Sequence, residues 1–504
     1  MTRLLRTNAI VAFSFITTLF FSSDSVFAVS QPELRKRSAD LPPAVSREFR
    51  GAWVTTVYNV DWPSKRTLST AQQKAELIAI LDRAAGLKLN AIVLQVRTEC
   101  DAFYASPYEP WSAFLTGKMG EAPKPFYDPL AFAVEQAHQR GLELHAWINP
   151  FRARVSEKEI LSAGHVARKY PQLTRKHGQF LWLDPGDKAA QDYTLRVSQD
   201  IIKRYDIDGF QIDDYFYPST QPGPNGKALD FDDDATWKKY VSAGGKLKRD
   251  DWRRENVNTF VKRLYDTIKA EKSWVKFGIS PPGIWRPHNP PQITGRDVYQ
   301  AIYADSRKWL LNGWCDYFAP QLYWPIDKRE QSYPVLLKWW TEQNPKHRHL
   351  WPGLATGNVG SSWKPSEIAN QIQIARTQQG VSGHLHYHMG TLMKNPKSLA
   401  TDLQRLYSEP ALVPASPWLY NVPPEKPTAT VRRTGTQIQL SWQGSARNQI
   451  RYWILQKRVG SKWTTQILPS QETSRRFSNG EADVIALTAV NRFGVASAPT
   501  LVQP

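Results

Sequence analysis

Eight short apolar segments alternate with longer helix-like segments between residues 48 and 412, and this alternation is the strongest constraint on the fold. Each short segment has the length and composition of a buried parallel strand. The strand candidates are residues 50–57, 91–97, 143–148, 209–213, 276–280, 317–323, 349–354 and 383–387. Eight strand–helix units predict an α/β fold, a (β/α)₈ barrel of the TIM type. An open, doubly wound sheet is the alternative, although no glycine-rich nucleotide loop supports it.

The helix candidates carry recognisable ends. Asp128 and Pro129 are typical of an N-cap followed by proline in the first turn, and Gly141 follows the end of the same helix. Each candidate lies between two strands or follows the last one, as a barrel requires. The predicted helices cover residues 70–86, 128–140, 187–205, 252–271, 297–311, 334–343, 366–378 and 398–407.

The first 28 residues have the pattern of a secretory signal peptide. Arg3 and Arg6 precede an apolar run over residues 9–21, and a small residue, Ala28, ends a cleavage-type pattern. No cysteine lies near the expected cut, so we expect no lipid anchor there. No later run is apolar enough to cross a membrane. We therefore expect an exported chain, periplasmic in a Gram-negative cell, with residues 29–47 as a polar lead-in.

A second, smaller module follows the predicted barrel, which we place at residues 48–412. Residues 413–424 form a proline-bearing linker, and residues 425–504 contain short alternating runs separated by turn residues. These runs resemble a fibronectin type III sandwich. Such a module carries no catalytic signature, so we expect a spacer, with a glycan or envelope-protein contact as the alternative.

The composition favours an anionic partner and disfavours a disulfide. The formal net charge is +19, which suits an anionic polymer, and export argues against nucleic acid. The basic residues are scattered, however, so a generally basic proteome is an alternative explanation. The 20 tryptophans can stack on sugar rings as well as fill the core. Cys100 and Cys315 fall at opposite ends of the predicted barrel and are expected to be separate buried thiols.

The segment DGFQIDDYFYP, residues 208–218, is the most informative motif. Side chains alternate along a strand, so Gln211 and Asp213 share one face while Phe210 and Ile212 share the other. A buried parallel strand is normally apolar on both faces. Polar residues on one phase, ending in Asp213, therefore predict a strand that delivers a carboxylate to the barrel mouth. The alternative is an aspartate pair that caps the next turn.

Polar and aromatic residues also follow the other predicted strands, where TIM barrels place their chemistry. Their convergence on one rim is the signal, because a buried polar group without a partner costs about 1–3 kcal/mol. The residues predicted to bind substrate are Arg97, Trp111, His145, Trp147, Asn149, Arg152, Tyr217, Trp285, Gln321, Tyr323, Trp324 and His386.

Carboxylates, aromatics and amides without a serine–histidine elbow or phosphate loop suit glycosidic bond hydrolysis, which usually needs two carboxyl groups. We predict that Asp213 is the nucleophile or charge-stabilising carboxylate and that Asp214 orients neighbours or binds a hydroxyl. The proton donor is expected from Glu99 or Asp101. Arg97, in phase with Glu99, would lower the pKa of that carboxyl and disfavour a donor role. The prediction requires a second acid facing Asp213 across a sugar-sized gap.

Seven segments occur in order along the predicted barrel: EFRGAWVTTVYNVDWPSK, DAFYASPYEPWSAFLTG, HAWINPFR, LDPGD, DGFQIDDYFYP, FGISPPGIWR and DYFAPQLYW. This series resembles the glycosyl hydrolase-like 10 family of bacterial envelopes. The resemblance implies a TIM-type barrel that hydrolyses peptidoglycan glycan strands, including strands stripped of stem peptides. Such strands carry lactyl carboxylates, which suit a basic protein. It also places Asp213, Asp214 and the loop at Asp101 in the most recognisable motifs.

Three other functions remain open. His384, His386 and His388 alternate and could hold zinc beside Asp213, as in a metal-dependent deacetylase. The first strand carries no histidine, so we expect hydrogen-bonding histidines and neither metal nor cofactor. A non-catalytic glycan-binding scaffold would keep the aromatic rim, and a hydrolase of another exopolysaccharide would keep both rim and acids.

Overall fold

The computed structural model describes residues 41–223, 226–445 and 449–504. The predicted signal peptide and most of the lead-in lie outside the described residues. Residues 43–504 form one compact unit. Across the described ranges, no helix combines the length and apolar character that a membrane crossing needs.

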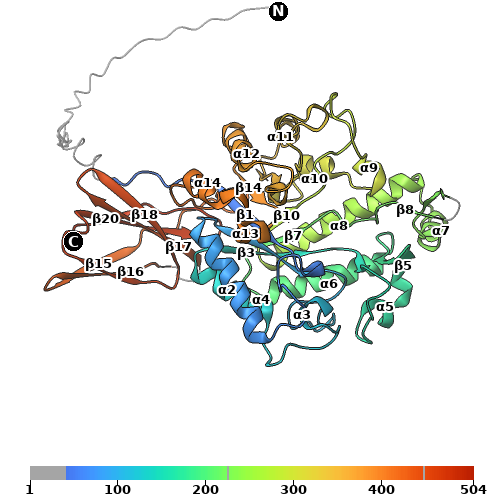
Figure 1. Cartoon of the computed structure of the whole chain (residues 1–504), viewed down its shortest axis with the longest axis horizontal. Coiled ribbons are helices and arrows are strands. Elements are labelled where there is room, and N and C mark those ends of the chain that lie inside the picture. The colour runs from blue at the N-terminus through green and yellow to red at the C-terminus, as the bar shows by residue number, and fades with distance from the viewer. Residues whose placement is uncertain (1–40, 224–225, 446–448) are drawn as a thin grey trace, which may run out of the picture. The chain divides into compact units, whose positions relative to one another are not determined.

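Parallel strands form a closed barrel (Figure 1). In spatial order around it lie β1 (Phe49–Val54), β2 (Ala91–Arg97), β3 (Glu143–Ile148), β7 (Gly209–Ile212), β10 (Lys276–Ile279), β11 (Tyr317–Phe318), β12 (His349–Leu350), β13 (Gly353–Leu354) and β14 (Gly383–His386). β12 pairs with β11, and β13 pairs with β14. These two pieces are one seventh strand, interrupted at Trp351 and Pro352, that closes the ring. The predicted TIM-type barrel is confirmed.

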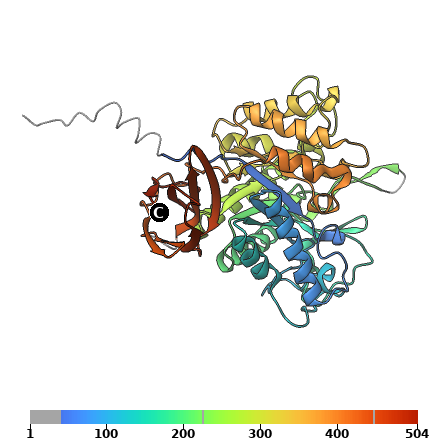
Figure 2. The ribbon, with the colours of Figure 1, turned by 60° about the vertical axis from the view of Figure 1, so that its left-hand side comes forward.

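Helices surround this ring in Figures 1 and 2. They include α2 (Thr70–Gly86), α4 (Pro129–Gln139), α6 (Lys188–Arg204), α8 (Arg249–Glu271), α11 (Tyr333–Glu342), α12 (Pro365–Thr377) and α14 (Leu399–Leu406). Asp128 caps α4 by accepting the backbone N–H of Ala131, as its sequence predicts. The prediction of a single helix over residues 297–311 is wrong. The segment is divided into α9 (Val298–Ala301) and α10 (Ser306–Asn312), because Asp305 starts a second helix by accepting from Lys308 N.

Aromatic side chains fill the barrel interior near the amino ends of the strands. Trp351, at the interruption of the seventh strand, stacks on Phe49 with ring centroids 3.7 Å apart and on Tyr317 at 4.7 Å. Trp53, Trp147 and Leu385 belong to the same inner cluster, whereas the alternate strand residues pack against the helices.

A β-sandwich follows the barrel, as the sequence predicts. One sheet contains β15 (Thr428–Thr434), β16 (Gln437–Gln443) and β19 (Ser474–Ser478). The other contains β17 (Ile450–Val459), β18 (Lys462–Pro469), β20 (Val484–Asn491) and β21 (Thr500–Val502). Leu440, Trp442, Trp453 and Leu487 pack between the sheets. Its classification as fibronectin type III stays a prediction.

Arg451 on β17 ties the sandwich to the barrel. Its Nε lies 2.7 Å from Oδ1 of Asp208, the residue before β7, and its Nη2 donates to Leu142 O. His138 Nε2 and the backbone N–H of Leu144 contact Oδ2 of the same carboxylate, each at 2.9 Å. Burial alone would raise the pKa of Asp208, but Arg451 and His138 hold it well below its usual range.

The other contacts of the sandwich and linker also lie at the amino ends of the barrel strands. Arg492 forms two hydrogen bonds with Asp206, and Trp418 Nε1 donates to Asp316 Oδ1 at 2.9 Å. Because these contacts lie at the amino ends, the sandwich covers the barrel end opposite the carboxyl ends of the strands.

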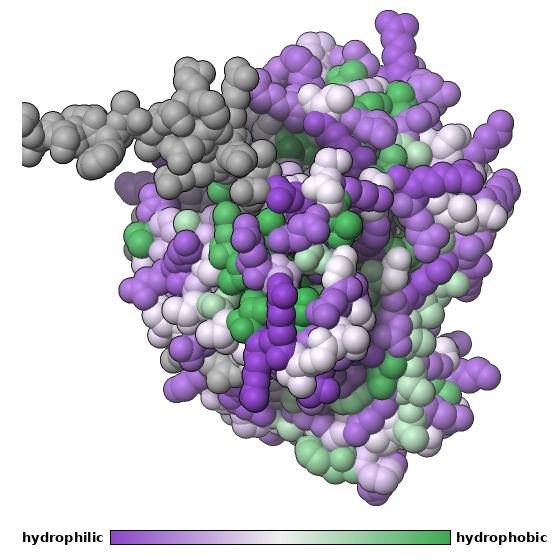
Figure 3. Space-filling model, turned by 90° about the vertical axis from the view of Figure 1, so that its left-hand side faces the viewer, coloured by the Kyte–Doolittle hydropathy of each residue, from purple (hydrophilic) through white to green (hydrophobic). Residues whose placement is uncertain are grey.

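Figure 3 shows the unit from the left-hand side of Figure 1, and hydrophilic side chains cover most of the surface visible there.

Replacing Arg451 by methionine is expected to lower the free energy of unfolding by about 3 kcal/mol, because Asp208 would remain buried without its main counter-ion. Urea unfolding followed by tryptophan fluorescence measures this. The matched control is Arg432→Met, an exposed position on the same sandwich, which is expected to change stability by less than about 0.5 kcal/mol. Equal stability of the two variants would contradict the assigned role of Arg451.

Candidate active site

A cavity of about 180 Å³ opens at the carboxyl ends of the barrel strands. Aromatic rings form part of its wall, and Tyr323 stacks on Tyr387 with centroids 5.5 Å apart. The lining residues are Trp53, Thr55, Val57, Gln95, Trp147, Arg152, Gln211, Asp213, Asp214, Tyr215, Ser280, Gln321, Tyr323 and Tyr387. The cavity thus lies where TIM barrels carry their active sites.

Asp213 is the first residue after β7 and is only 4% exposed. Its Oδ2 accepts hydrogen bonds from Trp147 Nε1, at 2.8 Å, and from Asn149 Nδ2. Its Oδ1 lies 3.4 Å from the backbone nitrogen of Tyr215. The Asp213 side chain therefore faces the barrel mouth, as the alternation of side chains along the strand predicts.

A series of amide hydrogen bonds fixes Asn149. Its Oδ1 accepts from Gln95 Nε2 at 2.9 Å and from Arg152 Nη2, so its NH₂ group must face Asp213. Gln95 Oε1 in turn accepts from the backbone N–H groups of Thr56 and Val57, each at 3.0 Å. Residues at the ends of β1, β2, β3 and β7 are thereby connected, and we call this series the amide relay.

Burial and the neighbouring charge of Asp214 raise the pKa of Asp213 to about 8. Burial also raises the pKa of Asp214, which is half-buried in the same cavity. Two adjacent carboxyls that resist simultaneous ionisation hold a shared proton near neutral pH. Such a pair can both donate and accept a proton during a reaction.

Gln211 lies on the cavity floor at the top of a buried polar column. Lys276 Nζ contacts Glu143 Oε1 at 2.9 Å, and Glu143 Oε2 lies 3.0 Å from His145 Nε2. His145 Nδ1 is 3.0 Å from the Tyr317 hydroxyl, which contacts Gln211 Oε1 at 3.2 Å. Within the part of the chain that the structure describes, Gln211 Nε2 has no hydrogen-bond partner.

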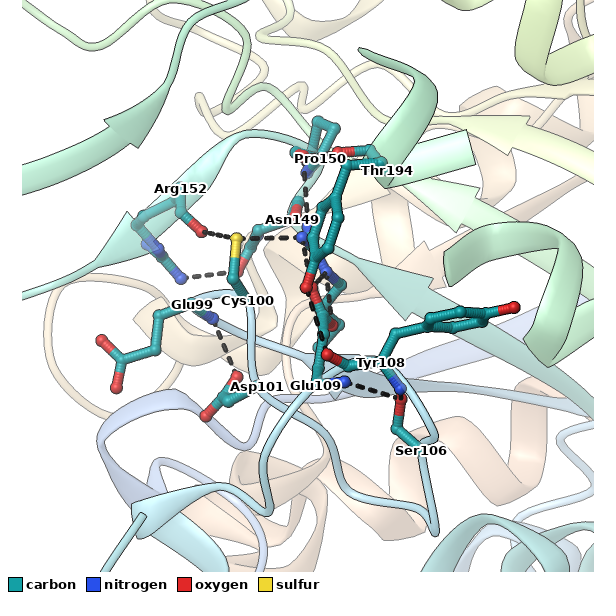
Figure 4. Close-up of polar contacts among 12 residues, drawn as sticks. Glu99, Cys100, Asp101, Ser106, Tyr108, Glu109, Asn149, Pro150, Arg152 and Thr194 are labelled. Carbon is teal, nitrogen blue, oxygen red and sulfur yellow. Dashed lines mark hydrogen bonds and ion pairs between the residues drawn. The ribbon is translucent and has the colours of Figure 1, made fainter. Parts of the chain in front are cut away.

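The structure does not bring Glu99 and Asp101 to the cavity (Figure 4). Asp101 Oδ1 accepts from the backbone N–H groups of Thr98 and Glu99, at 3.0 and 2.9 Å, and so stabilises its own loop. Glu99 Oε2 accepts from Val155 N at 2.8 Å, and the side chain is enclosed. Burial and Asp101 raise the pKa of Glu99 to about 8, so the expected lowering by Arg97 is wrong.

Arg97 is fully buried and cannot contact a substrate. The β2–β3 pairing shifts register between Gln95 and Arg97, and this bulge changes the phase that simple alternation predicts. The guanidinium binds both oxygens of Glu109 and also donates to Cys100 Sγ and Asn149 O. It therefore stabilises the β2 and β3 loops. Cys100 and Cys315 are both buried free thiols, as predicted.

Four of the residues predicted to bind substrate line the cavity, namely Trp147, Arg152, Gln321 and Tyr323. Asn149 lies behind Asp213, and His145 lies in the column below. Trp111, Tyr217, Trp285 and Trp324 do not line it. Tyr217 is only 1% exposed and packs against Phe231 and Tyr303.

The predicted phase of the eighth strand is wrong. Leu385 packs inside the barrel and Tyr387 lines the cavity, so His384 and His386 face outward. Both ring Nε2 atoms contact the Tyr407 hydroxyl next to α14. Two of the three predicted zinc ligands, His384 and His386, therefore point away from Asp213, while His388 Nδ1 contacts Asp61 Oδ1. His386 cannot bind a substrate in this cavity.

The predicted binding residues omit several residues that line the cavity. Trp53 and Thr55 are in phase on the first strand, and Gln211 is in phase with Asp213, so alternation could have identified them. Gln95 shares the inward phase of the second strand by alternation, but its role depends on Asn149 and is identified only by its contacts. Tyr387 could be identified as a lining residue only with the correct inward phase of β14.

A cavity with acidic, aromatic and amide side chains at the mouth of a parallel barrel favours a glycan-binding enzyme site. Comparison of the sequence with known protein families gives the same class of enzyme. The model of the family described as Glycosyl hydrolase-like 10 matches residues 48–369, and the chain belongs to that family. The protein is thus a glycoside hydrolase, and its substrate is a glycan.

Two curated relatives and one solved structure show how far the similarity extends. Glycosyl hydrolase YngK of Bacillus subtilis is 38% identical over 482 residues, covering 91% of each chain. Glycosyl hydrolase DigH of Escherichia coli K12 is 36% identical over 353 residues, covering 65% of this chain and 77% of DigH. The catalytic domain of a β-amylase from Paenibacillus polymyxa superposes with a TM-score of 0.49 at 12% identity, covering 72% of this chain and 99% of that domain.

Gln95→Glu is expected to lower kcat by roughly 10- to 100-fold with a smaller change in KM, because misplacing a catalytic group has effects of that order. The new carboxylate can still accept from Thr56 and Val57 but cannot donate to Asn149 Oδ1. Steady-state kinetics on a glycan substrate measures the change.

Gln73→Glu is the matched control for that variant. Gln73 on α2 is also buried, and its Nε2 donates to Leu68 O and Leu115 O, away from the cavity. Both variants bury a new carboxyl and are expected to lose stability, but only Gln95→Glu is expected to lose kcat. An unchanged kcat in Gln95→Glu would contradict the role of the amide relay.

Proposed function

We propose that this protein is an exported hydrolase that cleaves glycosidic bonds in peptidoglycan glycan strands, including strands freed of stem peptides. The observation that supports it most is the cavity that holds Asp213 and Asp214 at the barrel mouth. The formal net charge of +19 supports a polyanionic glycan, because stem-peptide-free strands expose lactyl carboxylates. The signal-like N-terminus supports export to the compartment where that polymer lies.

In this proposal, Asp213 and Asp214 are the catalytic carboxyls, and the lining aromatics bind sugar faces. Arg152 holds a positive charge beside the pair, since its guanidinium lies 4.1 Å from the Tyr215 ring centroid and bonds to Asn149. Trp53, Trp147, Tyr323 and Tyr387 offer the ring faces that carbohydrate recognition uses. Glu99 and Asp101 have no catalytic role in it, because both are enclosed outside the cavity.

Asp213→Asn is expected to reduce cleavage of stem-peptide-free murein by about 1,000-fold, the scale of a lost charge-stabilising catalytic group, while glycan binding is retained. Digestion of intact and stem-peptide-free murein, with fragment masses read by mass spectrometry, measures the loss. Asp266→Asn, an exposed position on α8, is the matched control and is expected to keep full activity. Full activity of Asp213→Asn would remove Asp213 from the mechanism.

The stability difference between this variant and the native protein is expected to depend on pH. In the folded protein the pKa of Asp213 is raised from 3.8 to about 8, so between these values the unfolded chain loses a proton that the folded protein keeps. The stability contributed by this proton is present below pH 3.8 and is lost as pH rises through 8. The melting temperature of Asp213→Asn relative to the native protein should therefore increase from pH 5 to pH 8. A constant difference in scanning calorimetry would contradict the raised pKa.

A further inference from the structure

The two acids of the cavity lie on one wall. Among the described residues that line it, Asp213 and Asp214 are the only carboxyls, and both directly follow β7. Mechanisms with two carboxyls place them on either side of the scissile bond, about 5–5.5 Å apart for retention or 6.5–9.5 Å for inversion. Consecutive residues at one strand end do not span a sugar ring in that way.

Three other buried carboxyls near the strand ends accept backbone hydrogen bonds, although Glu99 Oε1 has no partner among the described residues. Glu99 accepts from Val155 N, and Asp101 holds its own loop. Asp61 accepts from the backbone N–H groups of Thr55, at 2.7 Å, and Gly390, at 2.6 Å, and also contacts His388. None of the three lines the cavity. The second acid predicted opposite Asp213 is not among the described lining residues, so an attacking group must come from elsewhere.

We propose that the substrate supplies it: the carbonyl oxygen of a 2-acetamido group, on the sugar held in the cavity, attacks C1 of the same sugar. This inference rests on the proposed hydrolase function and restricts its substrates to 2-acetamido sugars at the cleaved bond. Glycosidases that use their substrate in this way are an established exception to the rule of two opposed carboxyls.

The cavity has the features that an acetamido group needs. Its volume of about 180 Å³ equals the space of about six waters, room for that group and part of one ring. Asp213, fixed by Trp147 and Asn149, can accept the acetamido N–H. Gln211, whose buried Nε2 has no hydrogen-bond partner among the described residues, belongs to the cavity lining, and rings such as Trp53 can surround the methyl group.

The reaction balances with these groups alone. The acetamido oxygen forms a bond to C1 as the C1–O bond to the leaving sugar breaks, and Asp214 gives its proton to the departing oxygen. When the acetamido N–H donates to Asp213, the single proton of the acid pair lies on Asp214. The ionised Asp213 then holds the amide proton and stabilises the positive charge of the resulting bicyclic oxazolinium. Water then attacks C1, its proton passes to Asp214, and the C1–O bond to the acetamido group breaks. The product is a hemiacetal with retained configuration.

The first test uses three batches of the same stem-peptide-free glycan strands. All are de-N-acetylated, and two are then re-acylated, one with acetyl and one with trifluoroacetyl groups. The trifluoroacetyl group is neutral and similar in size, but its carbonyl oxygen is a poor nucleophile. The native protein is expected to cleave re-acetylated strands, while kcat falls at least about 100-fold on trifluoroacetylated strands because the intramolecular nucleophile is lost. Equal rates on both would overturn the inference and leave the proposed function standing.

The second test needs no turnover. A thiazoline derivative of N-acetylglucosamine mimics the bicyclic intermediate, and calorimetry is expected to show at least about 100-fold tighter binding to native protein than to Asp213→Asn. Asp266→Asn is the control and should bind as the native protein does. If no strand is cleaved but this binding is seen, the proposed polymer is wrong and the inference stands. If neither cleavage nor binding is seen, both are overturned.

Discussion

The active site depends on the orientation of one amide, that of Asn149. Its oxygen has two donors, Gln95 and Arg152, so its nitrogen has to face Asp213. That orientation results from hydrogen bonds which begin at the backbone of β1 and pass through β2 and β3 before they reach β7. The carboxylate of Asp213 at its strand end is therefore positioned by four strands together, and its precision comes from barrel closure rather than from its own loop.

The same arrangement works against folding. Placing two adjacent carboxyls under aromatic rings raises the pKa of both, and the surrounding fold must offset the cost of their ionisation. The aromatic interior around Trp351 and the buried pair of Arg451 with Asp208 provide packing and charge compensation elsewhere in the unit. Stability at such sites is typically exchanged for reactivity.

The sequence predicts well where alternation alone decides the outcome. Asp213 faces inward because β7 is regular, and eight strand–helix units close because their order permits one barrel. Arg97 could not be placed in the same way, since a register shift after Gln95 leaves no mark in the residue types. His386 was misplaced because polar and apolar residues alternate on β14 with the histidines facing a tyrosine on the helix side. Both errors concern polar residues whose buried partners lie on other segments of the chain.

The position of Arg451 has an evolutionary consequence. A barrel of this kind that lost its sandwich would retain an aspartate before β7 whose negative charge is compensated from another module. Descendants without the module should therefore carry a compensating change at position 208 or a new cation nearby. The arginine and the aspartate should co-vary across lineages, and the two modules should be gained or lost as a pair.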